Sequence, residues 1–432
     1  LNIHGVRLIH WQRVKMRKTA KVDYNSTTAA NLLRAVQARE FIREEMEEKE
    51  KKNLKRYCIL DLPKDCIYKT LIKLPIESLR RSSLVCKPWY KMINNSIFIQ
   101  DHLRRSEMGL IFLSKSPGGE TNSDENVFHV EKHYLPSKTS WESRIEQYEV
   151  ELNLQFMEIK HGKSMVKSLK LSSYGEIRAA CNGLVLLENS RICGPIVINP
   201  VTREYTVLCR GTIALPQDES YGFAYSYGTG VYKVVHLFRD HLRYFGCEII
   251  EVSSHTWRAV DGPSFGLTSQ LGKAPVVAIE AFHWMPHIEN SEYIVSMGID
   301  DEKFRKIQLP KTSGRYDGLV DMGGCLWFVS HADYNQLDVW ILKDLDGSKW
   351  ILKQSIIAGL TLCMVPFGYT SRNKLVLKRD INQTLFTYDF EQREMKEIEM
   401  NEGCSPYLGS YVPHFNSLVS WKNRIGQRLE DV

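Results

Sequence analysis

Few residues of this chain have the type and spacing of a catalytic site, and Ser226 comes nearest to a hydrolase nucleophile. One large class of hydrolases presents that serine in a Gly-x-Ser-x-Gly turn between a strand and a helix. Here the sequence reads Ala224-Tyr-Ser-Tyr-Gly228, lies between two expected strands and precedes no expected helix. We therefore interpret Ser226 as a turn residue.

A phosphate-binding loop would require Gly-x4-Gly-Lys-Ser/Thr, so that backbone N–H groups surround the phosphates. The segment 266–273 comes closest, but it has one residue too many and is followed by Ala274. The dinucleotide-binding pattern Gly-x-Gly-x-x-Gly does not occur in the sequence. The sequence thus predicts no nucleotide cofactor.

Two histidines at i and i+4 can bind zinc when they lie on one face of a helix. Two such pairs occur, His129/His133 and His283/His287, and neither has the His-Glu-x-x-His order of zinc proteases. The first pair lies in strand-like sequence, where this spacing loses its geometry, and Pro286 interrupts any helix at the second. Surface or hydrogen-bonded core histidines are favoured, and no metal site is predicted.

The composition of the 432-residue chain is that of a globular protein with a sizeable core, at 43% hydrophobic and 25% charged residues. No apolar run is long enough to cross a membrane, which excludes an integral membrane protein. The 10 cysteines form no Cys-x-x-Cys pair, and no secretory signal pattern is present. We expect reduced, mostly buried thiols and a location in the cytoplasm, the nucleus or both.

The net charge of +6 is distributed unevenly along the chain. Residues 1–56 hold 14 Lys/Arg and 7 Asp/Glu, residues 57–106 hold 9 and 4, and residues 107–432 hold 34 and 40. Because the large C-terminal part is mildly acidic, a nucleic-acid partner is not expected. Residues 1–56 are expected to form a flexible basic tail and a polar linker helix over 28–56. Met16 is a candidate natural start, which would place residues 1–15 outside the native protein.

Residues 57–106 are predicted to form a small unit of three short helices. Pro63, Pro75 and Pro88 are 12 and 13 residues apart, and proline fits the first turn of a helix because that turn needs no N–H donor. An amphipathic stretch follows each proline. Because helices of about 8–11 residues are too short to be stable alone, we expect them to pack on each other and on a partner.

This helical unit resembles an F-box. The resemblance rests on Leu62-Pro63, Leu74-Pro75-x-x-x-Leu79, Val85-Cys-Lys-x-Trp89 and the tail Phe98-Ile-x-x-His-Leu103, although Lys64 stands where an acidic residue is usual. It implies binding to a Skp-type adaptor, which connects F-box proteins to a cullin–RING ubiquitin ligase. The residues implied to form the helical core or to face the adaptor are Leu62, Pro63, Ile67, Leu71, Leu74, Pro75, Leu79, Val85, Cys86 and Trp89. Trp89 is the expected hot spot, because buried tryptophans often dominate interfaces.

Residues 107–432 are predicted to form an all-β, propeller-like domain. A strand, a turn and a second strand recur at 196–208, 247–260, 293–309, 337–352 and 385–400. Equivalent positions in these units are 52, 48, 45 and 46 residues apart, a period typical of kelch-type propellers. Strands at 109–114 and 128–135 and the segment 412–421 are expected to supply an extra blade or to close the ring, giving about six blades.

This domain resembles the F-box-associated domain of plant F-box proteins. The resembling segments are Ala180-Cys-Asn-Gly-Leu184, Val197-Ile-Asn-Pro-Val-Thr-Arg203, Tyr221-Gly-Phe-Ala-Tyr225 with Tyr232-Lys-Val-Val235, and Ser410-Tyr-Val-Pro413 with Ser417-Leu-Val419. Ser226 stands where an aspartate is usual in such proteins. The resemblance implies a substrate receptor and does not identify the substrate.

We therefore interpret the chain as a non-catalytic adaptor, the substrate-recognition subunit of an SCF-type (Skp–cullin–F-box) E3 ubiquitin ligase. The ligase would act by bringing a charged conjugating enzyme close to a target protein held by the propeller. One alternative is a kelch-like enzyme or carbohydrate-binding module with an incidental helical cap, which converging carboxylates or a metal in a pocket would favour. Another is a scaffold that binds the adaptor without the cullin.

Overall fold

The computed structural model of the chain describes residues 40, 43–44, 62–115, 128–129, 152–160, 162–173, 175–188, 194–264, 271, 274–286, 290–344, 349–357, 359, 361, 363–370, 374–400, 406 and 411–422. The expected basic tail and the linker helix at 28–56 lie outside these residues, apart from positions 40, 43 and 44. Among the described residues, no helix is long and apolar enough to cross a membrane.

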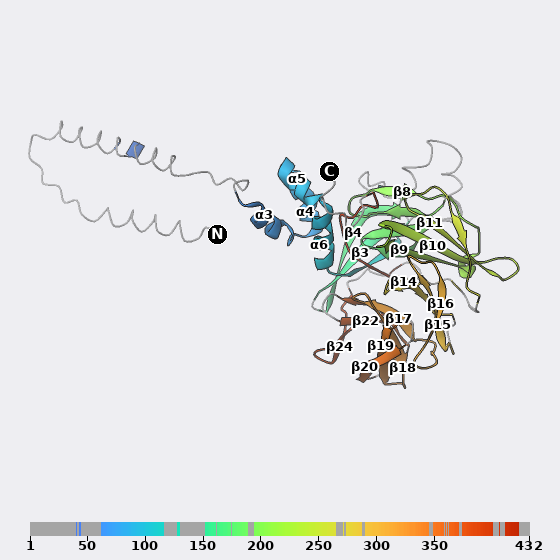
Figure 1. The fold of residues 1–432 in the computed structure, drawn as a ribbon. Coiled ribbons are helices and arrows are strands. Elements are labelled where there is room, and N and C mark those ends of the chain that lie inside the picture. Colours follow the sequence, from blue (N-terminus) through green and yellow to red (C-terminus); the bar gives the residue numbers. More distant parts are fainter. Residues whose placement is uncertain are drawn as a thin grey trace, which may run out of the picture. The chain divides into compact units, whose positions relative to one another are not determined.

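The N-terminal part of the described chain is helical, with four short helices in place of the expected three (Figure 1). Their bounds are α3 (Lys64–Leu71), α4 (Ile76–Ser82), α5 (Lys87–Ile93) and α6 (Ser96–Arg105). Pro63, Pro75 and Pro88 mark the starts of α3, α4 and α5, as predicted. The fourth helix follows no proline and begins at a side-chain cap instead, because Asn95 accepts the N–H of Ile97.

The rest of the described chain forms six sheets, five antiparallel with four strands each and one mixed sheet with five. From the innermost to the outermost strand, the first two four-stranded sheets are β5 (Glu176–Cys181), β6 (Leu184–Glu188), β7 (Ile196–Ile198), β8 (Tyr205–Val207), and β9 (Glu219–Ser226), β10 (Val231–Arg239), β11 (Phe245–Glu251), β12 (Arg258–Val260). The third and fourth are β13 (Val276–Ala278), β14 (Ala281–Trp284), β15 (Tyr293–Gly298), β16 (Phe304–Gln308), and β17 (Gly318–Met322), β18 (Cys325–His331), β19 (Gln336–Asp344), β20 (Lys349–Ile357). The fifth is β21 (Met364–Thr370), β22 (Lys374–Arg379), β23 (Leu385–Asp389), β24 (Glu394–Glu397), and a 3-10 turn, η3 (Pro216–Asp218), precedes β9.

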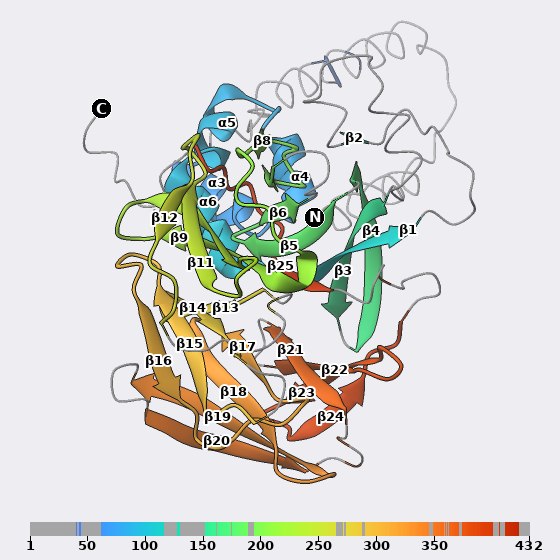
Figure 2. The same ribbon diagram turned by 90° about the vertical axis from the view of Figure 1, so that its right-hand side faces the viewer.

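The sixth sheet combines the two ends of the propeller. Its order is β25 (Val412–His414), β1 (Gly109–Lys115), β3 (Leu152–Lys160), β4 (Lys163–Ser173), with β2 (Phe128–His129) added in parallel to β4. The sheets follow one another in a ring (Figure 2), so each is one blade of a six-bladed propeller. The prediction of an all-β propeller with about six blades is confirmed.

The propeller core consists of six apolar clusters, one between each pair of neighbouring blades. Because both faces of a blade are covered, the middle strands are apolar without alternation, as in β6, where all five residues are buried. The outermost strands are largely exposed, as in β12 and β24. This contrast between middle and outer strands made the repeat readable in the sequence.

Each of the five predicted strand–turn–strand units is the outer half of a blade, formed by its third and fourth strands. The innermost strands β5, β13, β17 and β21, and the long pair β3 and β4, were not predicted. The inner strands are short or contain Gly, Pro and charged residues, and many of their residues are only half-buried, because their free edge borders the central channel. Their pattern therefore does not read as that of a buried strand.

All seven described cysteines are free thiols. Cys247 and Cys363 are buried, whereas Cys66, Cys209 and Cys325 are exposed. The prediction of mostly buried thiols is therefore wrong for the described cysteines. Because most of them lie on outer helices, turns or strand ends, their burial depends on blade position and not on residue type.

The ring is closed by pairing between the first and last strands, with β1 antiparallel to β25 over 109–111 and 412–414. The segment after β25 is then tied to the next blade by Asn199, a fully buried residue that follows β7. Its Nδ2 donates to the carbonyls of Ser417 and Val419, and its Oδ1 accepts the N–H groups of Val201 and Thr202.

The turn at Asn182-Gly183 also contacts the segment after β25. The hydroxyl of Ser417 donates to the carbonyl of Asn182, and Gly183 lies beside it at φ +87°. A Cβ at Gly183 would lie 2.1 Å from the Ser417 hydroxyl, which explains why this turn requires glycine. Two of the segments that carry the family resemblance, 180–184 and 197–203, thus both hold the closing segment.

Asn199→Ala removes the amide that donates two hydrogen bonds through Nδ2 and accepts two through Oδ1, and it leaves their backbone partners unpaired. We expect it to lower the free energy of unfolding by at least about 2 kcal/mol, because each such group costs about 1–3 kcal/mol. The measurement is urea unfolding followed by tryptophan fluorescence, with the exposed Asn335→Ala as a control that should stay within about 0.5 kcal/mol of wild type. Equal stabilities of the two variants would contradict the closing role of Asn199.

Candidate functional site

The four helices are held together by contacts of α6. The Tyr68 hydroxyl donates to Asp101 Oδ2 at 2.7 Å, and its ring packs edge-on against Phe98 at 5.2 Å. Burial and the bond to Asp101 raise the pKa of Tyr68 to about 12. His102 Nε2 lies 3.0 Å from the carbonyl of Leu74, beyond the end of α3. Ile99 of α6 belongs to the apolar cluster between the blades β5–β8 and β9–β12.

The surface of this helical segment is unusually apolar. Five large apolar side chains of residues 62–97 are between 46% and 83% exposed: Leu62, Leu84, Val85, Tyr90 and Ile97. Leu84 and Val85 form the turn between α4 and α5, and Tyr90 follows on α5. Several large apolar side chains exposed to this degree on one short segment are typical of protein-binding surfaces.

The ten residues predicted from the sequence separate into two groups. Ile67, Leu71 and Leu79 are buried and belong to the core. Leu62, Pro63, Pro75 and Val85 are exposed, and Leu74, Cys86 and Trp89 are half-buried. The structure therefore assigns Leu62 and Val85 to the accessible apolar surface. The expected hot spot Trp89 is only partly accessible, and its enclosed Nε1 has no hydrogen-bond partner among the described residues.

Comparisons with known proteins agree with this arrangement. A profile of the F-box domain matches residues 59–101, and a profile of the F-box associated beta propeller domain matches residues 132–409. The chain belongs to the F-box proteins with an F-box associated beta propeller domain. Two Arabidopsis thaliana relatives are F-box protein CPR1, 23% identical over 81% of this chain and 87% of its own length, and F-box/kelch-repeat protein At3g23880, 23% identical over 70% and 80%. One chain of a nidogen/laminin crystal structure aligns with 72% of this chain and 99% of its own, at 8% identity and a TM-score of 0.40.

In this F-box protein, sequence reasoning missed three exposed apolar residues of the helices, Leu84, Tyr90 and Ile97. The available signal was the run Leu84-Val85, three residues before Pro88, which places two apolar side chains in the turn before α5, where no helix face can bury both. The family comparisons indicate no enzymatic family for the chain.

The candidate nucleophile of this F-box protein is enclosed. Ser226 is fully buried at the end of β9, where its hydroxyl contacts Thr229 and donates to Asp300. No imidazole is bonded to this hydroxyl in the described part of the chain, so a general base is missing there. The interpretation as a turn residue is wrong by one position, because Ser226 is the last residue of β9 and the turn to β10 follows at 227–230.

Of the four histidines in the two candidate pairs, only His283 has a described side chain. The Nε2 of His283 donates to the carbonyl of Ala278 at 3.0 Å, so its Nδ1 accepts from Ser296 at 2.6 Å. Burial lowers the pKa of His283 to about 4 and keeps it neutral. His133, His287 and the side chain of His129 lie outside the described residues, as does nearly all of the segment 266–273. Among the described side chains, no group of three or more His, Cys, Asp or Glu residues could hold a metal ion.

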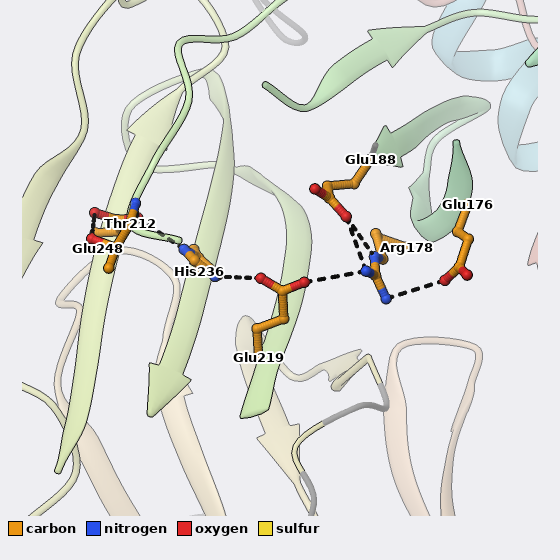
Figure 3. A network of polar contacts seen from close by, with 7 residues as sticks. All are labelled: Glu176, Arg178, Glu188, Thr212, Glu219, His236 and Glu248. Carbon is orange, nitrogen blue, oxygen red and sulfur yellow. Dashed lines mark hydrogen bonds and ion pairs between the residues drawn. The ribbon is translucent and has the colours of Figure 1, made fainter. Parts of the chain in front are cut away.

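The F-box protein does contain one cluster of converging carboxylates, which spans two blades (Figure 3). Arg178 of β5 pairs with Glu188 at 2.9 Å, with Glu219 of the next blade at 3.2 Å and with Glu176 at 3.4 Å. The ring of His236 then connects Glu219, at 3.2 Å from Nε2, to Glu248, at 2.8 Å from Nδ1. The network crosses from the blade β5–β8 to the blade β9–β12.

This network stabilises the fold, because most of its groups are buried and each carboxylate has a hydrogen-bond or ion-pair partner. Glu188, Glu219 and His236 are almost inaccessible, and each carboxylate has a cation, an imidazole or the Thr212 N–H as partner. Burial alone would lower the pKa of His236, but hydrogen bonds to Glu219 and Glu248 outweigh it and raise the pKa above its usual value. Burial would raise the pKa of Glu248, yet the bond from His236 lowers it. The carboxylates therefore neutralise two cations between blades and leave no open position for a substrate.

A pH-dependent stability follows from the raised pKa of His236. Its contribution is fully present below the unfolded pKa of about 6.5 and is lost as the pH rises through the higher folded pKa. We expect the stability difference between wild type and His236→Gln to shrink as the pH rises above about 6.5, by no more than about 1.4 kcal/mol per pH unit. Urea unfolding at several pH values measures this difference.

The exposed His241, in the turn between β10 and β11, provides the control for that experiment. His241→Gln should differ from wild type by less than about 0.5 kcal/mol throughout the same range. A stability difference for His236→Gln that grows with rising pH would contradict the assignment of the network.

Proposed function

We propose that this F-box protein is the substrate-recognition subunit of an SCF-type E3 ubiquitin ligase, in which the helices bind a Skp-type adaptor. The observation that carries the proposal is the exposure of four large apolar side chains, Leu84, Val85, Tyr90 and Ile97, on the segment matched by the F-box profile. Helices of seven to ten residues cannot bury such side chains themselves, so a partner would cover them. Burial of each would contribute about 1.5–3 kcal/mol.

The propeller would hold the target protein. In a four-stranded meander, the loops after the second and fourth strands lie at one end of the blade. Six exposed apolar side chains lie on such loops: Ile213, Leu215, Leu242, Tyr244, Tyr334 and Ile381. Their position at one end, opposite to the end where α6 leads into β1, supports a target surface directed away from the helices.

No side chain of this chain would perform chemistry in the proposed function. The ligase would act by proximity, because holding a target lysine near the charged conjugating enzyme raises its effective concentration. We propose that this receptor is located in the cytoplasm or the nucleus. The reducing environment of these compartments is compatible with a ubiquitin ligase and with the seven described free cysteines.

Val85→Asp tests adaptor binding without disturbing the helical core. An exposed side chain can accept a charge in the free protein, whereas the charge would be desolvated at an apolar interface. We expect at least a tenfold increase in the dissociation constant for a purified Skp-type adaptor, about 1.4 kcal/mol, measured by titration calorimetry.

Ile213→Asp is the matched control, since it places the same charge on an exposed apolar position of the propeller. It should bind the adaptor like wild type. The proposal fails if folded wild-type protein does not bind the adaptor, or if Val85→Asp and Ile213→Asp bind it equally.

A further inference from the structure

The propeller contains a cavity that the proposed function does not use. It has a volume of about 850 Å³ and lies along the channel, where the innermost strand of every blade borders it: 178–181, 223–225, 276–278, 319–321, 367–369 and 412–414. Many of its lining residues belong to turns between the first and second strands of a blade, so it reaches the end of the channel where these turns meet. A cavity of this volume is in the range of ligand-binding sites.

Tyrosine rings form part of its wall. Tyr225 and Tyr227, at the end of β9, pack edge to face with 5.1 Å between ring centroids, and Tyr227 is well exposed. Tyr369 lies on β21 and also borders the cavity. Burial, then the nearby charge of Asp321, raises the pKa of Tyr369. The faces of such rings carry partial negative charge and attract cations.

The charged groups of the cavity are predominantly negative. Its only lining Lys or Arg in the described part of the chain is Arg178, which is already bound by three carboxylates. The lining carboxylates Glu280 and Asp321 have no ion pair among the described residues, and Asp321 accepts one backbone bond, from Gly324, at 2.8 Å. Burial raises the pKa of Asp321 to about 6, so this carboxyl group lacks a compensating cation.

The other ionisable neighbours do not reverse this balance. His414 borders the cavity, and burial lowers its pKa to about 3, which keeps it neutral. The positive charge of Arg104 on α6 acts to lower the pKa of Tyr227, but Arg104 forms an ion pair with Asp101 at 3.3 Å.

The backbone at Glu280 adds an independent observation. Ile279 and Glu280 form the turn between β13 and β14 with φ of +48° and +54°. At the same place in two other blades the turns are Asn182-Gly183 and Gly323-Gly324, the residues that such a turn favours. Glu280 thus occupies a position where glycine would be less strained. Its turn is bonded to the turn that follows Asp321, because the Ile279 N–H donates to the Gly324 carbonyl at 3.2 Å, and both carboxylates line the same cavity.

We propose that this end of the channel binds an organic cation, an ammonium or guanidinium group, between the carboxylates of Glu280 and Asp321 and the rings of Tyr227 and Tyr369. The carboxylates supply the compensating charge, and the tyrosine faces supply cation–π contact. The cation can belong to a lysine or arginine side chain of a bound protein or to a free polyamine, since both present the same chemistry.

Titration calorimetry on the full chain tests the proposal with three probes: spermidine, a capped glycine pentapeptide with arginine at its centre, and the same peptide with glutamate at its centre. We expect at least one cationic probe to bind and the glutamate peptide not to bind. Binding of spermidine alone assigns the site to free amines, and binding of the arginine peptide alone assigns it to a protein side chain.

Two variants locate the site. Glu280→Gly relieves the strained turn, so the melting temperature of this variant should be no lower than that of wild type. Its dissociation constant for the cationic probe should be at least tenfold higher. Asp321→Asn should raise the dissociation constant for the cationic probe by a similar factor. Glu391→Gln, which removes an exposed carboxylate from the outer turn between β23 and β24, is the control and should bind like wild type.

Three results would overturn the proposal: no binding of either cationic probe to folded wild type, binding of the glutamate peptide with equal affinity, or unchanged binding in both Glu280→Gly and Asp321→Asn. Adaptor binding by the same variants is expected to equal that of wild type. A failure of the channel site is therefore distinguishable from a failure of the proposed adaptor function.

Discussion

The antiparallel pairing of β1 with β25 is the constraint on which the rest of the propeller depends. Each blade is apolar on both faces, so each needs a neighbour on both sides. An open ring would expose one face of the first and last blades to water. Closure places the two ends of the propeller sequence in one sheet, and Asn199 then holds the segment after β25 with two hydrogen bonds, to the carbonyls of Ser417 and Val419.

Closure also determines where the helical segment is attached. α6 ends at Arg105 and β1 begins at Gly109, so the helices continue directly into a strand of the closing sheet. Ile99 packs in the cluster between the next two blades, which adds a second apolar connection. For the proposed receptor function such a connection would be an advantage, because proximity catalysis depends on orientation.

The molecule uses buried charge at one blade interface and exposed apolar surface on its helices, and the two have different physical meanings. The carboxylates around Arg178 and His236 are compensated within the fold, so they specify how two blades fit together (Figure 3). Leu84 and Val85 are not compensated by any packing, because a turn between two seven-residue helices has no face to bury them. Exposed apolar side chains without packing partners indicate a binding partner, whereas buried charges with partners inside the fold indicate a role in stabilising it.

The sequence by itself determined the local features. Three prolines set the starts of α3, α4 and α5, and a period near 50 residues revealed the outer half of five blades, because buried third strands and aromatic fourth strands repeat their pattern locally. Only the tertiary structure decided which F-box residues are buried, since Leu79 and Val85 are both apolar in sequence and differ only in what packs on them. It also decided the pairing of β1 with β25 and the joining of Glu280 and Asp321 at one cavity, because contacts between residues far apart in the chain leave no local periodicity to read.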